Sequence, residues 1–252
     1  MPHTEFLAGP RGRQLAYVKT DGRGPGIVFL GGFKSDMEGT KALYLEEWAK
    51  ATGRSFIRFD YSGHGLSSEA FEDGSIGDWA ADAREILSTL TQDPQVLVGS
   101  SMGGWISLLL ARAMPHHVAG LVTIAAAPDF TEDSMWARFD ADQRAALLSD
   151  GQIALPSDYD DPYIITKRLI EDGRDNLVLR DPLKLPFPVR FLQGTADADV
   201  SMSVALHLLE HAQSSDMRLT LVDGADHRFS DPDCLAMITD AVEEVLTRIG
   251  AW

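Results

Sequence analysis

Cysteine is almost absent from this chain. Its 252 residues include a single cysteine, Cys234, which excludes an internal disulfide framework and agrees with a reducing compartment. Cys234 follows Asp231-Pro232-Asp233, a pattern typical of a helix start. We therefore interpret Cys234 as a small buried hydrophobic residue and not as a nucleophile.

Positive charge is also scarce. The chain has 22 Lys and Arg residues against 38 Asp and Glu residues, which gives a formal net charge of −16. Such an acidic balance repels phosphate backbones and anionic lipid headgroups. We therefore do not expect nucleic acid as a partner.

Long apolar runs are missing as well. No window approaches the roughly 20 apolar residues that a membrane-spanning helix needs. The N-terminal stretch MPHTEFLAGPRGRQ lacks the apolar core of a secretory signal. We therefore expect a cytoplasmic protein with no stable membrane insertion.

Short apolar runs are present, and they alternate with amphipathic stretches typical of helices. These runs are apolar at nearly every position, as in strands of a parallel sheet that helices cover on both faces. They lie at residues 26–32, 55–61, 95–100, 118–127, 189–194 and 217–222. The pattern predicts one α/β domain with a doubly wound, mostly parallel sheet, and the chain is long enough to form it.

The segment 128–188 interrupts this rhythm. A helix is expected from Asp140 and Gln143, which resemble a capping box, to Gly151. A second helix is expected from about Asp160-Asp161-Pro162 to about Gly173. We predict that 128–188 forms a small helical cap, inserted into a core of residues 1–127 and 189–252. The cap would cover the carboxyl edge of the sheet, where open α/β sheets bind ligands.

Ser101 is the candidate nucleophile. The sequence VLVGSSMGG contains two adjacent serines, but a sharp strand-to-helix turn needs small residues two positions before and after the exposed serine. Only the frame Gly99-Ser100-Ser101-Met102-Gly103 satisfies this requirement. The spacing therefore predicts a nucleophile elbow at Ser101.

A serine nucleophile needs a general base and a carboxylate that orients the base. On a doubly wound hydrolase sheet the expected chain order is serine, acid, histidine. His227 follows the run at 217–222 and is the expected base. Asp197, which follows the run at 189–194, is the preferred acid, with Asp199 and Asp129 as alternatives. Asp199 also fits the cap of a helix that starts near Ser201.

The other histidines have simpler interpretations. His64, in DYSGHG, lies upstream of the nucleophile and is expected to be structural or to line the pocket. His207 and His211 are four residues apart on a predicted helix but have no further ligand at the spacing of a zinc site. We therefore predict no metal and no cofactor.

Two backbone N–H groups are expected to stabilise an oxyanion beside Ser101. Met102 follows the nucleophile at the start of a helix, where the helix dipole adds positive potential. Gly31-Gly32 let the chain pass close to Ser101 and present the N–H of Phe33.

The motifs G-S-S-M-G, G-T-A-D and D-H-R occur in this order, and the chain therefore resembles the α/β-hydrolase superfamily. The flanks GTKALYLEEWAKATGRSFIRFDYSGHG and LVGSSMGGW are similar to the branch of abhydrolase-domain proteins with mitochondrial palmitoyl-protein thioesterase and acyl-glucuronide hydrolase activity. The resemblance implies a Ser101-Asp197-His227 triad and oxyanion donors at Phe33 and Met102. It also implies an acyl ester or thioester substrate. Gly31 and Gln193 depart from it, since many members carry histidine there.

The expected function is hydrolysis of a small acyl ester or thioester, with acyl glucuronides and acylated proteins as further candidate substrates. Trp136, Phe139 and Tyr163 of the predicted cap are expected to bind the acyl chain, with Trp105 as an alternative wall. A non-catalytic ligand receptor on the same scaffold is the competing interpretation, because a fold does not fix a function.

Overall fold

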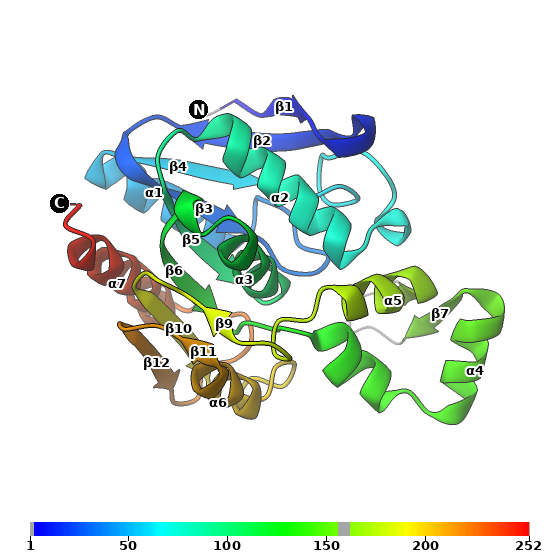
Figure 1. The fold of residues 1–252 in the computed structure, drawn as a ribbon. Coiled ribbons are helices and arrows are strands. Elements are labelled where there is room, and N and C mark those ends of the chain that lie inside the picture. Colours follow the sequence, from blue (N-terminus) through cyan, green and yellow to red (C-terminus); the bar gives the residue numbers. More distant parts are fainter. Residues whose placement is uncertain (1–2, 156–161, 252) are drawn as a thin grey trace.

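The computed structural model describes residues 3–155 and 162–251. The main sheet has eight strands in the order β1-β2-β4-β3-β5-β6-β10-β12 (Figure 1). The strands are β1 (Glu5–Ala8), β2 (Gln14–Thr20), β3 (Arg23–Leu30), β4 (Arg54–Phe59), β5 (Gln95–Ser100), β6 (Val118–Ile124), β10 (Val189–Gly194) and β12 (Met217–Val222).

The six strands from β4 to β12 in the sheet run parallel to one another, which confirms the predicted fold class. The antiparallel strands β1 and β2 extend the sheet beyond β4. The sequence pattern did not predict these two strands. β1 has four residues and is largely exposed, and β2 leads into β3 with no helix between them.

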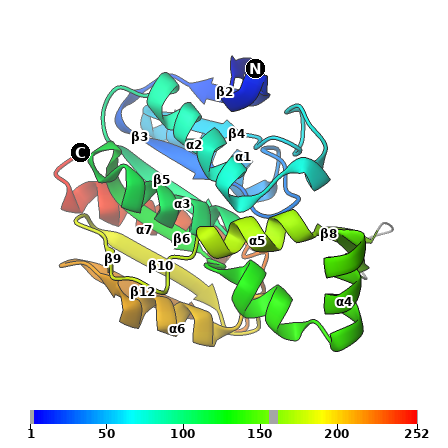
Figure 2. The same cartoon turned by 45° about the vertical axis from the view of Figure 1, so that its right-hand side comes forward.

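Helices cover both faces of the sheet. α1 (Thr40–Thr52) and α7 (Pro232–Arg248) lie on one face, and α2 (Ile76–Leu90), α3 (Met102–Ala113) and α6 (Met202–His211) lie on the other (Figures 1 and 2). Each face has its own buried apolar cluster. The short elements are η1 (Pro10–Gly12), η2 (Phe71–Asp73), η3 (Pro115–His117), β9 (Leu183–Lys184) and β11 (Ala212–Gln213). In the described part of the chain, no helix is both long and apolar enough to cross a bilayer.

The segment after β6 contains helices, as predicted, and also a β-hairpin, which was not predicted. Its elements are the π-helix η4 (Thr131–Trp136), α4 (Ala141–Asp150), β7 (Gln152–Leu155), β8 (Tyr163–Thr166) and α5 (Lys167–Asp175). α4 begins at the expected capping box of Asp140 and Gln143, and it ends at Gly151 in the left-handed conformation. We call residues 128–188 the cap segment.

The expected second helix of the cap segment starts later than predicted. Asp160 and Asp161 lie outside the described residues, and Pro162 precedes β8 and not a helix. α5 begins only at Lys167, where the Thr166 side chain accepts a hydrogen bond from the N–H of Leu169. The sequence Tyr163–Thr166 consists of aromatic and β-branched residues, which favour strands, and it pairs with β7.

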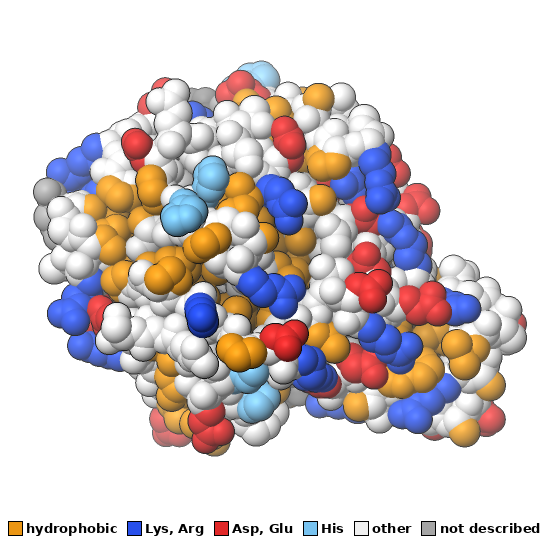
Figure 3. All heavy atoms as spheres, in the orientation of Figure 1, with side chains coloured by type: hydrophobic (Ala, Val, Ile, Leu, Met, Phe, Trp, Pro, Cys, Tyr) orange, Lys and Arg blue, Asp and Glu red, His pale blue; other side chains and the backbone are white. Residues whose placement is uncertain are grey.

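Ion pairs and hydrogen bonds attach the cap segment to the core. The carboxylate of Asp172 in α5 accepts a hydrogen bond of 2.6 Å from the N–H of Gly77 in α2. Arg168 pairs with Asp78, which also lies in α2. Basic and acidic side chains are intermingled over this part of the surface (Figure 3), and Arg174 pairs with Glu132 between α5 and η4.

Candidate active site

Ser101 lies in the sharp turn between β5 and α3. Its backbone has φ 53° and ψ −117°, a conformation that is strained for a residue with a side chain. The glycines of the motif permit the turn. A Cβ on Gly99 would lie 2.3 Å from the carbonyl oxygen of Gly103, and one on Gly103 would lie 2.0 Å from that of Leu30. The strained residue is therefore Ser101, whereas Ser100 is a buried residue at the end of β5.

A hydrogen-bonded chain connects Ser101 to His227 and Asp197. The Nε2 atom of His227 lies 3.1 Å from the Oγ of Ser101, and its Nδ1 lies 2.9 Å from Oδ2 of Asp197. Because a carboxylate only accepts, Nδ1 carries the hydrogen and Nε2 is free to accept the serine proton. The three residues come from the ends of β5, β10 and β12, which are distant in the sequence.

Asp197 is held by several donors. Its Oδ1 accepts hydrogen bonds from the N–H groups of Asp199 and Val200, at 2.9 and 2.8 Å. Its Oδ2 accepts a bond of 3.0 Å from the side-chain amide of Gln193, which is fully buried. Burial by itself raises the pKa of Asp197, but the hydrogen bonds from His227, Val200 and Gln193 outweigh it and lower the pKa. Asp197 therefore stays a carboxylate.

The loop that carries His227 is fixed on both sides of the histidine. Lys41 of α1 donates a hydrogen bond to the carbonyl oxygen of Arg228. The N–H of Phe229 donates to Oδ1 of Asp226 at 3.1 Å. Burial lowers the pKa of Lys41, while the nearby Asp226 opposes this change.

The other candidate acids have different surroundings. Asp129 is fully buried and accepts hydrogen bonds from the N–H groups of Val178 and Leu179, at 2.8 and 3.0 Å. It joins the two ends of the cap segment and does not contact His227. Asp199 is exposed. The N-cap residue of α6 is Ser201, so the prediction that Asp199 caps this helix is wrong.

The elements that carry the predicted oxyanion donors lie next to Ser101. Met102 is the first residue of α3, and the first N–H groups of a helix have no partner within it. The loop after β3 passes close to the elbow, because a Cβ on Gly32 would lie 3.4 Å from the Cβ of Ser101. Phe33 follows this glycine.

The donor atoms of Asp197, Asp199 and His227 lie within 4.8 Å of one another, which is the spacing of a metal site. His227 and Asp197 are hydrogen-bonded to each other, however, so neither offers a free ligand atom on that side. His207 and His211 lie side by side on α6, with ring centroids 5.9 Å apart. The Nε2 of His211 lies 2.7 Å from the carbonyl oxygen of Asp181.

Aromatic rings surround Phe33. Its ring lies 4.8 Å from Phe71, 5.9 Å from Trp79, 5.6 Å from Phe130 and 6.3 Å from Tyr163, in edge-to-face contacts. We call these five residues the Phe33 cluster. Of the predicted substrate residues, Tyr163 therefore lies beside Phe33, the residue predicted to carry an oxyanion donor.

The other predicted substrate residues make different ring contacts. Trp105 is fully buried beneath Phe130, at a ring distance of 5.5 Å. Trp136 packs against Phe139, and the guanidinium groups of Arg144 and Arg174 lie 5.2 and 4.6 Å from the centre of its ring.

Sequence reasoning missed Phe130 and the amide of Gln193. Phe130 directly follows Asp129 at the entry to the cap segment, and this position was the available signal. Gln193 was noticed only as a departure from the family pattern.

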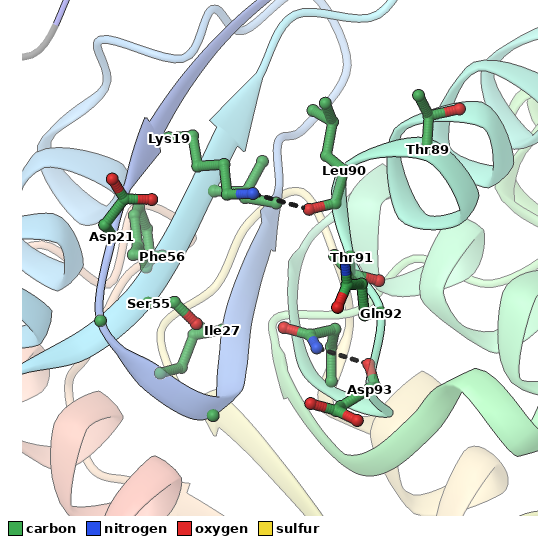
Figure 4. Close-up of a pocket in the computed structure, with 14 residues that line it drawn as sticks. Lys19, Asp21, Ile27, Ser55, Phe56, Thr89, Leu90, Thr91, Gln92 and Asp93 are labelled. Atoms are coloured by element: carbon green, nitrogen blue, oxygen red, sulfur yellow. Dashed lines mark hydrogen bonds between the residues drawn. The ribbon is translucent and has the colours of Figure 1, made fainter.

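A cavity of about 320 Å³ lies at the amino ends of the parallel strands, away from Ser101 (Figure 4). It is lined by the beginnings of β4 and β5 and by the end of α2, including Ser55, Leu90 and Gln95. Lys19 donates a hydrogen bond to the carbonyl oxygen of Leu90 across it. Since Ser101 follows the carboxyl end of β5, this cavity is separate from the hydrogen-bonded chain.

Comparison with known proteins agrees with this geometry. A family model described as the alpha/beta hydrolase fold matches residues 29–164. The chain belongs to the α/β-hydrolase family. The chain is 32% identical to the mitochondrial palmitoyl-protein thioesterase ABHD10 of Bos taurus, over 97% of this chain and 80% of the relative. The human protein of the same name is also 32% identical, with the same coverage.

Solved structures of this α/β-hydrolase family superpose closely. A putative hydrolase from Agrobacterium vitis S4 is 38% identical, with a TM-score of 0.94, and covers 97% of this chain and 99% of its own. ABHD10 from mouse is 31% identical, with a TM-score of 0.90 and coverage of 98% and 99%. The curated relatives are named as mitochondrial proteins, so the cytoplasmic location stays a prediction.

Proposed function

We propose that this protein is a serine hydrolase that cleaves carboxylic esters or thioesters through an acyl-enzyme on Ser101. The observation that carries the proposal is the continuous hydrogen-bonded chain from Ser101 through His227 to Asp197. A serine hydroxyl is a weak nucleophile at neutral pH, and such a chain is the usual means of activating it.

In the first half of the reaction, Nε2 of His227 accepts the proton of Ser101 Oγ as this oxygen attacks the acyl carbon. Asp197 stabilises the imidazolium that forms, through the bond of 2.9 Å to Nδ1. The N–H groups of Phe33 and Met102 bind the negative oxygen of the tetrahedral intermediate. His227 then protonates the leaving alcohol or thiol, and the acyl group stays on Ser101.

In the second half, His227 accepts a proton from water, and the resulting hydroxide attacks the acyl group. A second tetrahedral intermediate forms and is stabilised by the same N–H groups. Its collapse returns the proton to Ser101 and releases a carboxylic acid.

The substrate class that we favour is an acyl thioester, including the S-acyl groups of acylated proteins. Two features support it: the relatives named as palmitoyl-protein thioesterases and the apolar Phe33 cluster beside the proposed oxyanion site. Acyl glucuronides and simple esters share the same reacting carbonyl and are the alternatives. We further propose that residues 128–188 act as the substrate roof, with Trp136, Phe139 and Tyr163 as acyl contacts and Trp105 behind them.

Steady-state turnover of p-nitrophenyl esters and acyl-coenzyme A thioesters of increasing chain length tests the proposal. We expect multiple turnovers by the wild-type protein and none by Ser101→Ala. Binding of these compounds without turnover would instead favour a ligand receptor.

A further inference from the structure

The loop that presents the Phe33 N–H contains few internal hydrogen bonds. One turn bond joins the N–H of Ser35 to the carbonyl oxygen of Gly32, at 3.2 Å. Lys34 lies between these two residues in the left-handed region, with φ 57°. A residue with a side chain keeps this conformation only where its surroundings hold it.

His64 supplies such a contact. The N–H of Lys34 donates a hydrogen bond of 3.2 Å to Nε2 of His64. The Nδ1 atom of His64 lies 3.1 Å from the carbonyl oxygen of Ser62. Because a carbonyl oxygen only accepts, Nδ1 carries the hydrogen and Nε2 is the acceptor. The two contacts therefore require a neutral imidazole in one tautomer.

Ser62 is itself fixed by a buried ion pair. Both its N–H and its hydroxyl donate to Oδ2 of Asp82, at 3.0 and 2.6 Å. Arg13 pairs with the other oxygen of Asp82 at 3.0 Å, and the side chains of both residues are almost fully buried. The position of His64 is thus set by contacts in the core of the protein.

The imidazole ring is also enclosed by the Phe33 cluster. Its centroid lies 5.2 Å from both Phe71 and Trp79, which also contact the ring of Phe33. Only 3% of His64 is exposed. The pKa of His64 is lowered to about 4. Burial is the main cause, the bond to Ser62 opposes it, and the nearby Lys34 ammonium adds to the lowering.

We propose that His64 is a positioning residue for oxyanion stabilisation. Its neutral imidazole holds the backbone of Lys34, so that the preceding N–H, that of Phe33, stays directed toward the oxygen bound at Ser101. The inference rests on the proposed hydrolase function. His64 itself touches neither the substrate nor the nucleophile, since it acts through the peptide backbone.

Two substitutions separate this role from simple packing. His64→Phe keeps an aromatic ring but removes the acceptor, whereas His64→Gln retains a side chain with both donor and acceptor atoms. Loss of an oxyanion donor costs about 100- to 1000-fold in kcat, so a displaced donor is expected to cost about 10- to 100-fold. We expect this loss in His64→Phe with little change in KM, and partial recovery in His64→Gln.

A second measurement does not depend on turnover. Hydrogen exchange of the Lys34 amide is expected to be faster in His64→Phe than in the wild type, and close to the wild type in His64→Gln. Wild-type NMR of histidine nitrogens is expected to find Nδ1 protonated and Nε2 unprotonated in His64, and this needs no variant.

The results that would overturn the proposal are distinct. One is that His64→Phe keeps the wild-type kcat and the wild-type exchange rate of the Lys34 amide. Another is that His64→Phe and His64→Gln lose the same share of kcat. The third is that NMR finds the hydrogen of His64 on Nε2. A wild-type protein that turns over no ester or thioester would refute the hydrolase function instead. The exchange of Lys34 would then still decide whether His64 holds the loop.

Discussion

At the scale of single residues, the backbone conformation distinguishes Ser101 from its neighbour Ser100. Ser101 lies in the turn at φ 53° beside His227, while Ser100 ends β5 and is buried. We expect Ser101→Ala to lower kcat by at least about 10⁴-fold, because the nucleophile is lost. Ser100→Ala should keep most of the activity. Initial rates with a p-nitrophenyl ester measure both, and comparable losses in the two variants would contradict the assignment.

His64 also predicts a pH dependence of stability. Its pKa of about 4 in the folded protein lies below the value of about 6.5 for an unperturbed histidine. Between these values the unfolded chain binds the proton and the folded chain does not, so stability falls as the pH falls from about 6.5 to about 4.

We expect this single group to remove roughly 2 kcal/mol from the free energy of unfolding between pH 7 and pH 4.5. Urea denaturation of the wild type and His64→Gln at both pH values tests this expectation. The variant should lose less stability than the wild type over this interval. An equal loss in both proteins would mean that His64 is protonated in the folded state near its ordinary pKa.

At the scale of elements, the contact between α5 and η4 depends on one glycine. A Cβ on Gly173 would lie 2.1 Å from Oγ1 of Thr131. An alanine in a helix normally stabilises it by roughly 0.5–1 kcal/mol relative to glycine. Here we expect Gly173→Ala to destabilise by about 1–3 kcal/mol, because the extra methyl group forces the two elements apart.

Limited proteolysis and thermal unfolding measure this effect. Asp175→Ala, an exposed position in the same helix, is the matched control and should behave like the wild type. Cleavage of Gly173→Ala is expected within residues 128–188. An unchanged melting temperature and cleavage pattern would show that α5 and η4 adjust without cost.

The aromatic residues of the cap segment differ in their contacts, and this predicts different kinetic effects. Tyr163 contacts both the ring of Phe33, at 6.3 Å, and the ammonium group of Lys34, at 5.0 Å. Alanine at Tyr163 should therefore shift the preferred acyl chain length, with little change in melting temperature. Trp136→Ala and Phe139→Ala test two positions earlier in the cap segment whose rings pack together.

The chain-length profile of kcat/KM is the readout for these variants. A shift in any one of them assigns that ring to the acyl path. If all three lose stability but keep the wild-type profile, the cap segment is only a scaffold, and the acyl path lies beside Phe33 and Trp105.

At the scale of the whole molecule, regular patterns were readable from the sequence and irregular ones were not. The strands β5, β10 and β12 were predicted with their observed bounds. Full burial of β5 and β10 leaves a continuous apolar signature, whereas β12 lies at the edge of the sheet and is partly exposed. The glycines two positions before and after Ser101 predicted the elbow. The structure explains why these positions must be small, because a Cβ on Gly99 or Gly103 would clash with the backbone of Gly103 or Leu30.

The unpredicted features depend on contacts between distant residues. The β7–β8 hairpin forms through pairing that a short sequence such as Tyr163–Thr166 does not reveal. The bond from Lys34 to His64 joins residues 30 positions apart, and its meaning depends on the tautomer that Ser62 selects. No local pattern encodes such a link.

The most direct test of the central claim is to map a fluorophosphonate adduct by peptide mass spectrometry. Such a probe reacts with an activated serine, and the proposed base His227 contacts the hydroxyl of Ser101, at 3.1 Å. We predict one adduct, on Ser101, that is absent after Ser101→Ala and greatly reduced after His227→Ala. An adduct on Ser100, or no adduct on a folded wild-type protein, would contradict the account.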